Sequence, residues 1–347
     1  MQRRDVLKAS GLAAAGSLAG CNGLFETQSL RTVPLVEDRP DAVYVPSHVE
    51  GMEMIGMGTK GRRAVGLMYS YPHRFWTVTG TRTEKVSLRE EDSVHLMATV
   101  WDVETKTVLP VDAGVTVDVR RDGESVAKRS PWPMLSQNMG FHFGDNFALD
   151  GDGTYSVVVD VGATSLARRG SFAGEFADPL SVEIPFEYEQ ATRDEITFEK
   201  LPDRKGSRDA LSPMQMDMVP LSTAPSAGDL DAMTTATTES GDATFLVAVV
   251  EDDDGPYLAV SPRTPYNRYV MPLMSLSATL TRDGETVFDD ALPAAIGPSL
   301  DYHYGTTIPS YEGGEELTIT VDAPPQVSRH EGYETAFLDV PAATVTL

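Results

Sequence analysis

The chain has 347 residues, of which 52 are acidic and 28 are basic, and its formal charge at pH 7 is −24. This charge repels phosphate backbones, which argues against nucleic acid as a partner. Hydrophobic residues make up 41% of the chain, enough for a folded core, but no run of about 18 apolar residues could span a bilayer. Because only seven of the bases are lysine, we expect a halophilic protein, although a merely acidic secreted protein would have a similar composition.

The N-terminus has the features of an export signal. Arg3 and Arg4 begin the pattern Arg-Arg-x-Val-Leu-Lys, which resembles the twin-arginine motif and precedes a short, weakly apolar run. Leu-Ala-Gly before Cys21 resembles a lipobox, whose cysteine is acylated and becomes the mature N-terminus. We therefore predict a signal peptide at residues 1–20 and a lipidated tether at 21–45. The acylated cysteine would anchor the protein in the lipid bilayer, on the extracytoplasmic face of the cell membrane.

The rest of the chain contains a repeat at an offset of 161 residues. Residues 115–144 align without gaps with residues 276–305. The identical pairs are Arg121/Arg282, Asp122/Asp283, Gly123/Gly284, Glu124/Glu285, Val126/Val287, His142/His303 and Gly144/Gly305. The segment Met52–Met54 also matches Met214–Met216, at an offset of 162. The repeat predicts two homologous tandem domains, at 46–190 and 208–347, with a linker at 191–207.

Both halves show the period-two alternation of half-buried strands. The expected strands are Val94–Val103, Val115–Val119, Tyr155–Val161 and Val182–Phe186, then Phe245–Val250, Leu276–Leu280, Leu317–Val321 and Ala343–Leu347. Asp-Gly pairs at 122–123 and 283–284 fit tight hairpins. The pattern predicts an all-β fold of two tandem immunoglobulin-like antiparallel β-sandwich domains.

The common enzyme motifs are missing from the sequence. It contains no glycine-rich phosphate loop, no G-x-S-x-G elbow, no HExxH and no recognisable nucleophile–base set, so we expect no enzyme activity. With Cys21 as the only cysteine, the folded part has no disulfide and no thiolate metal site.

Methionine and histidine are the remaining candidates for a site. The chain has 14 methionines and six histidines. Thioether and imidazole ligands suit copper and are tolerable for Fe(II), whereas packing in the core is the ordinary use of methionine. Several methionines are grouped, at 52, 54 and 57, at 134 and 139, at 214, 216 and 218, and at 271 and 274.

One loop resembles a known family. Pro133-Met134, followed by His142-Phe143-Gly144-Asp145-Asn146, is similar to the Pro-Met and His-Tyr-Gly-x-Asn loop of the periplasmic iron-transport protein family. The segment Gly51–Met54 also resembles that family's Gly-Met-Glu start. The resemblance covers about residues 50–190 and, more faintly, the second repeat. It implies an immunoglobulin-like fold that binds iron or copper ions beside an iron permease.

The family's metal ligands are the loop Met and His, a His-x-Glu pair on an early strand, and a later His. The resemblance makes Met134 and His142 the best candidates, with His73 and Glu53 as further candidates. The early pair is absent from the strand at 64–71, where only His73 follows. The departures leave this first set of ligands incomplete.

The second repeat has a complementary set. It keeps His303, and His330 resembles the family's later His, but Ala295 stands where the first repeat has Met134. Arg168 and Arg169 stand near the place of the later His in the first repeat. Three alternatives remain open: reduced sites, sites completed across domains or across the chains of a homodimer, or loss of metal binding.

Structural roles are the alternative for each histidine. His142 and His303 could hold a loop, His73 could lie in a surface turn, and we expect His95 to be structural or solvated and His48 to be exposed. The function that these features favour is an anchored metal-binding lipoprotein for iron or copper uptake, with affinity falling below about pH 6.5 as imidazole protonates. The alternative is a non-catalytic surface β-sandwich lipoprotein with a structural or interaction role and no metal.

Overall fold

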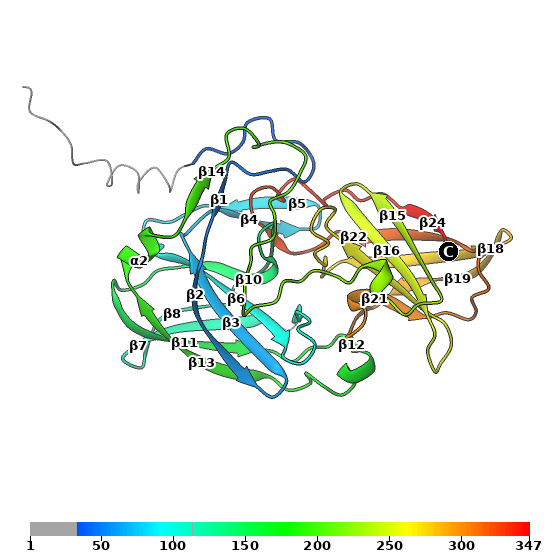
Figure 1. Cartoon of the computed structure of the whole chain (residues 1–347), viewed down its shortest axis with the longest axis horizontal. Coiled ribbons are helices and arrows are strands. Elements are labelled where there is room, and N and C mark those ends of the chain that lie inside the picture. Colours follow the sequence, from blue (N-terminus) through cyan, green and yellow to red (C-terminus); the bar gives the residue numbers. More distant parts are fainter. Residues whose placement is uncertain (1–32, 113) are drawn as a thin grey trace, which may run out of the picture. The chain divides into compact units, whose positions relative to one another are not determined.

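Antiparallel β-sheets make up almost all of the chain's regular structure. The computed structural model describes residues 33–112 and 114–347 (Figure 1). Its helical elements are short: α2 (Gln190–Asp194), η1 (Gly170–Phe172) and η2 (Ala227–Asp229). Within the described residues, no helix is long and apolar enough to cross a membrane. The predicted signal peptide, its Arg3–Arg4 pair and the lipidated Cys21 lie outside the described residues.

The first domain packs two sheets face to face. One sheet has the strand order β2-β3-β6-β10-β9-β23-β4-β5, and the other has the order β13-β11-β7-β8. The bounds of the first sheet are β2 (Glu53–Lys60), β3 (Arg63–Ser70), β4 (Phe75–Thr79), β5 (Arg82–Val86), β6 (Val94–Asp102), β9 (Trp132–Ser136), β10 (Gly140–Phe147) and β23 (Ser328–Arg329). Those of the second are β7 (Val115–Arg121), β8 (Glu124–Arg129), β11 (Gly153–Val161) and β13 (Leu180–Tyr188).

The second domain repeats this arrangement. Its sheets have the orders β12-β20-β21-β17-β16-β15 and β19-β18-β22-β24. The first has β12 (Ala167–Arg168), β15 (Thr234–Ser240), β16 (Ala243–Val250), β17 (Tyr257–Arg263), β20 (Ala294–Gly297) and β21 (Asp301–Thr307). The second has β18 (Ser275–Arg282), β19 (Glu285–Leu292), β22 (Glu316–Ala323) and β24 (Ala343–Thr346).

Apart from β4 and β5, which only the first domain has, the strands of the two sandwiches correspond one to one. The order β2-β3-β6-β10-β9 matches β15-β16-β17-β21-β20, and β13-β11-β7-β8 matches β24-β22-β18-β19. The expected all-β fold of two tandem β-sandwich domains is therefore confirmed. The match of Met52–Met54 with Met214–Met216 is wrong, because β15 is the counterpart of β2 and Met214–Met216 lies outside the strands.

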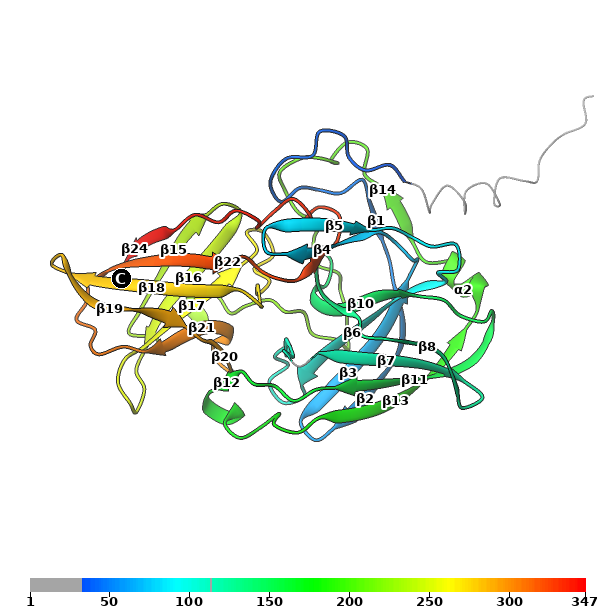
Figure 2. The same cartoon turned by 180° about the vertical axis from the view of Figure 1, so that it is seen from behind.

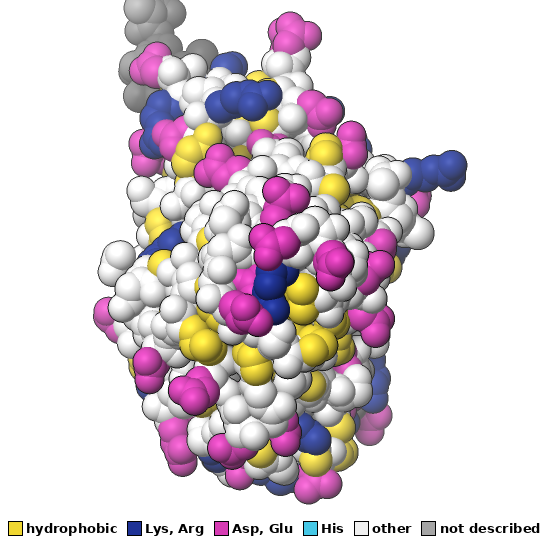
Figure 3. All heavy atoms as spheres, turned by 90° about the vertical axis from the view of Figure 1, so that its right-hand side faces the viewer, with side chains coloured by type: hydrophobic (Ala, Val, Ile, Leu, Met, Phe, Trp, Pro, Cys, Tyr) yellow, Lys and Arg dark blue, Asp and Glu magenta, His cyan; other side chains and the backbone are white. Residues whose placement is uncertain are grey.

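Local sequence explains the strands and their turns. In β13 (Leu180–Tyr188) buried and exposed residues alternate along the whole strand, as expected where one face packs on a core. The turns at Asp122-Gly123 and Asp283-Gly284 have positive φ at both residues, the conformation that two-residue hairpins favour and that an Asp-Gly pair tolerates. Acidic side chains are spread over the face seen in Figure 3, as the overall charge predicts.

Each domain contributes one short strand to a sheet of the other domain. β23, which follows β22 of the second domain, pairs in parallel with β9 and antiparallel with β4. Reciprocally, β12 of the first domain pairs in parallel with β20 of the second (Figures 1 and 2). This exchange lies within residues 35–347, which form one compact unit. It carries the residue after β23 into the first domain's sheet.

The C-terminal part of the predicted tether belongs to the fold. Val43, Tyr44 and Val45 are fully buried, and the backbone N–H groups of Tyr44 and Val45 donate to Gly332 and Ser207. Directly after it, β1 (His48–Glu50) pairs with β14 (Phe198–Lys200), which lies inside the predicted linker. The tether expected to reach residue 45 thus ends earlier, because its apolar run Ala-Val-Tyr-Val supplies side chains for burial.

Candidate metal centre

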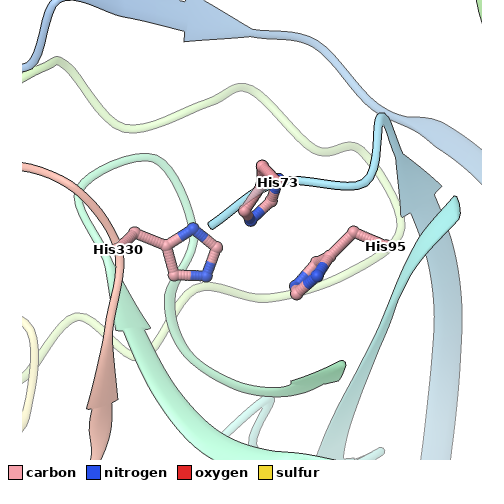
Figure 4. Close-up of side chains that lie close together, drawn as sticks. All are labelled: His73, His95 and His330. Carbon is pink, nitrogen blue, oxygen red and sulfur yellow. The ribbon is translucent and has the colours of Figure 1, made fainter. Parts of the chain in front are cut away.

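Three histidines converge at the junction between the domains. His73 follows β3, His95 lies in β6 and His330 follows β23, and one ligand nitrogen from each lies within 4.8 Å of the other two (Figure 4). Their rings also pack closely, with centroids 4.1 Å apart for His73 and His95 and 4.8 Å apart for His73 and His330. We call these residues, with His142 and Met134 described next, the histidine cluster.

His142 and Met134 complete the cluster. The His142 ring lies 5.2 Å from that of His330, and Met134 lies directly opposite His142 on the neighbouring strand. A Cβ atom at Gly144 would lie 2.7 Å from His95 Nε2 and 3.1 Å from Met134 Sδ. The imidazole and the thioether therefore face the same small space, which only glycine at position 144 leaves open.

The free nitrogens of this cluster have no hydrogen-bond partner. Among the described residues, the Nε2 atoms of His73, His95, His142 and His330 are all buried without one. The Nδ1 atoms of three are paired: His73 with the Tyr71 carbonyl at 3.1 Å, His95 with Asn146 Oδ1 at 2.9 Å, and His142 with the Gly140 carbonyl at 3.1 Å. Since these oxygens only accept, each Nδ1 carries the proton and each Nε2 presents a lone pair.

Asn146 orients two of the ligands. Its Oδ1 accepts hydrogen bonds from His95 Nδ1 and from the backbone N–H of His73, and its Nδ2 donates to the His73 carbonyl. Partners of this kind fix the tautomer and ring direction of metal-binding histidines. Both residues of the Gly144-x-Asn146 part of the loop motif have a structural role: Gly144 leaves space beside the candidate ligands His95 and Met134, and Asn146 fixes the orientation of His73 and His95 by hydrogen bonds.

A His-x-Glu pair stands behind His73. The Glu50 carboxylate lies 3.1 Å from His48 Nε2 and 3.6 Å from His73 Nδ1. Burial opposes the ionisation of Glu50, but hydrogen bonds from His48 and His73 outweigh it and lower the pKa of the carboxyl to about 2. From the sequence we looked for a His-x-Glu pair only on the strand at 64–71, and we expected His48 to be exposed. The structure has a His-x-Glu sequence on β1, and His48 is half-buried.

Burial disfavours the protonated form of three histidines of the cluster, His95, His142 and His330. Desolvation lowers the pKa of His142 to about 4, and desolvation together with neighbouring histidines lowers the pKa of His95 and His330 well below 6.5. Neutral imidazole is the form that binds metal. His95, His142 and His330 therefore favour the neutral form below pH 6.5, and the fall in affinity below about that pH stays a prediction.

Four of the predicted site residues meet here, namely Met134, His142, His73 and His330. Glu53 does not, because its side chain is exposed on β2. His95, expected to be structural or solvated, was missed although it belongs to the cluster. Its signal was available in the sequence: a histidine in an otherwise apolar strand needs a buried polar partner.

The second domain does not assemble the predicted pair of His303 and His330. His303 Nε2 lies 3.1 Å from the Tyr257 hydroxyl, and its Nδ1 lies 3.0 Å from the Asp301 carbonyl. Tyr257 lies opposite Thr307 as His95 lies opposite Asn146, so tyrosine replaces that ligand. The prediction that His303 and His330 form one site is wrong, because β23 pairs with strands of the first domain and carries His330 there.

An arginine stands in the second domain where the first has His330. Arg169 follows β12 as His330 follows β23, and the backbone N–H of each donates to the corresponding strand, to Ile296 and Leu135 respectively. The guanidinium carbon lies 3.5 Å from the Tyr257 ring centroid, and the group pairs with Asp252. With Ala295 opposite His303, this position holds a fixed cation in place of a ligand set.

Comparison with known proteins gives the following matches. A family described as a domain of unknown function (DUF7350) matches residues 228–346. No curated protein matches the chain. Two solved structures of uropathogenic Escherichia coli FetP are similar to part of it. A copper-bound variant has 18% identity, covers 40% of this chain and 97% of that chain, and gives a TM-score of 0.29. The protein as isolated, after recombinant expression in the E. coli periplasm, has 17% identity, 41% and 96% coverage and a TM-score of 0.28.

Proposed function

We propose that the protein binds a transition-metal ion, copper or iron, outside the cytoplasm and holds it for an uptake system at the membrane. The observations that carry the proposal are the convergence of His73, His95 and His330, whose ligand nitrogens lie within 4.8 Å of one another, and the four buried Nε2 atoms of the cluster that have no hydrogen-bond partner among the described residues. The thioether of Met134 faces the space at Gly144 beside His95 Nε2. A buried acceptor without a donor costs about 1–3 kcal/mol. A bound metal ion would accept the lone pairs of these nitrogens at once, and so would account for buried acceptors that have no hydrogen-bond donor.

The donor set favours copper over iron. Imidazole suits both metals, whereas a thioether is a soft ligand that selects copper, Cu(I) above all. Among the described residues, the group whose ligand atoms lie within 4.8 Å of one another contains no carboxylate; Glu50 lies 3.6 Å from the Nδ1 atom of His73, the nitrogen opposite the free Nε2. We therefore expect tighter binding of copper than of iron, with iron as the second candidate.

The anchoring and the partner follow from the sequence features. Export by the twin-arginine route and acylation of Cys21 would place the metal site close to the bilayer, where an iron permease could receive the ion. Because His330 comes from the same chain as the other ligands, a monomer suffices for the site and a homodimer is not required.

The test is a copper titration in competition with a chelator of known affinity. We expect the wild-type protein to bind one tight equivalent and His142→Ala to lose it. His303→Ala is the matched control, since His303 is the buried counterpart of His142 in the repeat but lies outside the cluster. Absence of tight copper and iron binding, or equal binding by wild type and His142→Ala, would favour the metal-free structural lipoprotein.

A further inference from the structure

A second group of sulfur ligands lies on the same sheet as the histidine cluster. It is an apolar cluster with Ala64, Met68, Met97, Trp101, Met139 and Val219 buried, and Met52, Met54, Val103 and Met216 partly buried against them. Six of these ten residues are methionines, three buried and three partly buried, whereas the far larger main core has Met271 buried and Met274 partly buried. We call the six the methionine cluster. Such enrichment points to a use of sulfur beyond ordinary packing.

The methionines form a row that leads to the histidine cluster. Met54 lies opposite Met68 across β2 and β3, and Met68 lies opposite Met97 across β3 and β6. Met97 in turn lies opposite Gly144, the residue that leaves room beside His95 and Met134. Side chains directly opposite one another share a face of the sheet, with Cβ atoms about 4.5–5.5 Å apart. The thioethers thus line one face from the edge strand β2 inward.

Sulfur ligands also approach from outside the sheet. The segment that contains Met214 and Met216 is joined to the first domain by a hydrogen bond from the Met214 N–H to the Asn138 carbonyl. Farther along the segment, Val219 lies against the sheet, 2.8 Å from where a Cβ at Gly66 would be. Met216 therefore packs over the row from this covering segment, and Met139 joins it from the turn before β10. Donors on several elements can converge on one ion.

The chemistry of these groups selects the ion. Thioethers are neutral, do not protonate in the physiological range, and prefer soft cations. The Trp101 indole of the cluster also supplies an aromatic ring, whose face attracts cations. We propose that the methionine cluster binds one soft monovalent cation, Cu(I) or Ag(I), at a position separate from the histidine cluster. This goes beyond the proposed function, and either site can fail without the other.

The test follows the methionine methyl groups by NMR while Ag(I), a redox-inert probe for Cu(I), is added to the full chain. All samples carry Cys21→Ser so that the thiol does not bind silver. In His142→Ala, where the histidine cluster should no longer compete for silver, we expect the ¹³C-methyl signals of Met54, Met68 and Met97 to shift and to saturate at one equivalent. The double variant Met68→Leu/Met97→Leu should weaken Ag(I) binding at least about tenfold. Replacement of methionine by leucine keeps the volume and usually costs less than about 1.5 kcal/mol, so the fold should remain.

Two controls make the outcome decisive. Met271→Leu replaces a buried methionine of the main core and should leave Ag(I) binding unchanged. His142→Ala removes the histidine cluster's ligand and should leave the methyl shifts of the methionine cluster in place. The inference is overturned if the first equivalent of Ag(I) moves only exposed methionines such as Met57 and Met218, or if the double variant binds as wild type does. Copper binding by the double variant tests the proposed function separately.

Discussion

Gly144→Ala is the smallest change that should empty the histidine cluster. The added Cβ would lie 2.7 Å from His95 Nε2, closer than real Cβ atoms approach, and 3.1 Å from Met134 Sδ, tighter than nine in ten real Cβ contacts. Gly144 does not have a positive φ, so alanine brings no backbone strain and acts only by occupying the space between the ligands. His95 must turn away from the metal, and disturbed ligand orientation typically costs 10–100-fold in affinity, or about 1.4–2.7 kcal/mol.

The assay compares copper affinity with stability. Crowding in a packed region costs about 1–3 kcal/mol, so Gly144→Ala should remain folded but with a lower midpoint of unfolding. Gly58→Ala is the matched control, because Gly58 lies in β2 of the same sheet as Gly144 and its Cβ would lie 2.7 Å from the Val182 Cβ of β13 in the facing sheet, away from the ligands. We expect Gly58→Ala to lose stability without losing copper affinity. If Gly144→Ala binds copper as tightly as wild type, the assignment of this space to a metal is wrong.

Three further predictions concern the same site. The pKa of His142 is about 4 in the folded state and about 6.5 in the unfolded chain, so the unfolded chain binds the proton more readily. The free energy of unfolding of the metal-free protein should therefore fall by on the order of 3 kcal/mol as the pH drops from 6.5 through 4. Urea unfolding at both pH values measures this loss, and an equal loss in His142→Ala would contradict the prediction. Asn146→Ala should weaken copper binding about 10–100-fold by freeing His73 and His95, and unchanged affinity in a chelator competition would remove its orienting role. His330→Ala should abolish the rise in melting temperature that copper gives, whereas His303→Ala should keep it, and calorimetry with and without copper separates the two outcomes.

Short-range sequence patterns predicted the strands and turns whose conformation depends mainly on neighbouring residues. The alternation of β11 and β13 and the Asp-Gly turns lie within short segments, and they indicated the sandwich correctly. Met134 and His142 were predicted from a family resemblance, which the sequence could carry because the two residues face each other across one hairpin and their motif is contiguous.

The rest of the site depends on pairing that no local pattern encodes. His330 reaches the cluster through β23, a strand of only two residues that crosses to the other domain. His95 becomes a ligand candidate only once β6 is known to lie beside β10, which brings it to Asn146. The pairing of His303 with His330 was wrong because sequence similarity shows which residues repeat and not which domain receives the exchanged strand.

Anomalous X-ray diffraction at the copper edge, from crystals of the copper-loaded protein, tests the central claim most directly. We predict a strong peak at about 2.0–2.3 Å from Nε2 atoms of the cluster histidines, with the Met134 sulfur also facing it, whether or not copper also occupies the methionine cluster. A second-domain peak beside His303 is not expected, because Arg169 already places a cation there. No peak at the histidine cluster, or a peak only at surface carboxylates, would contradict the account.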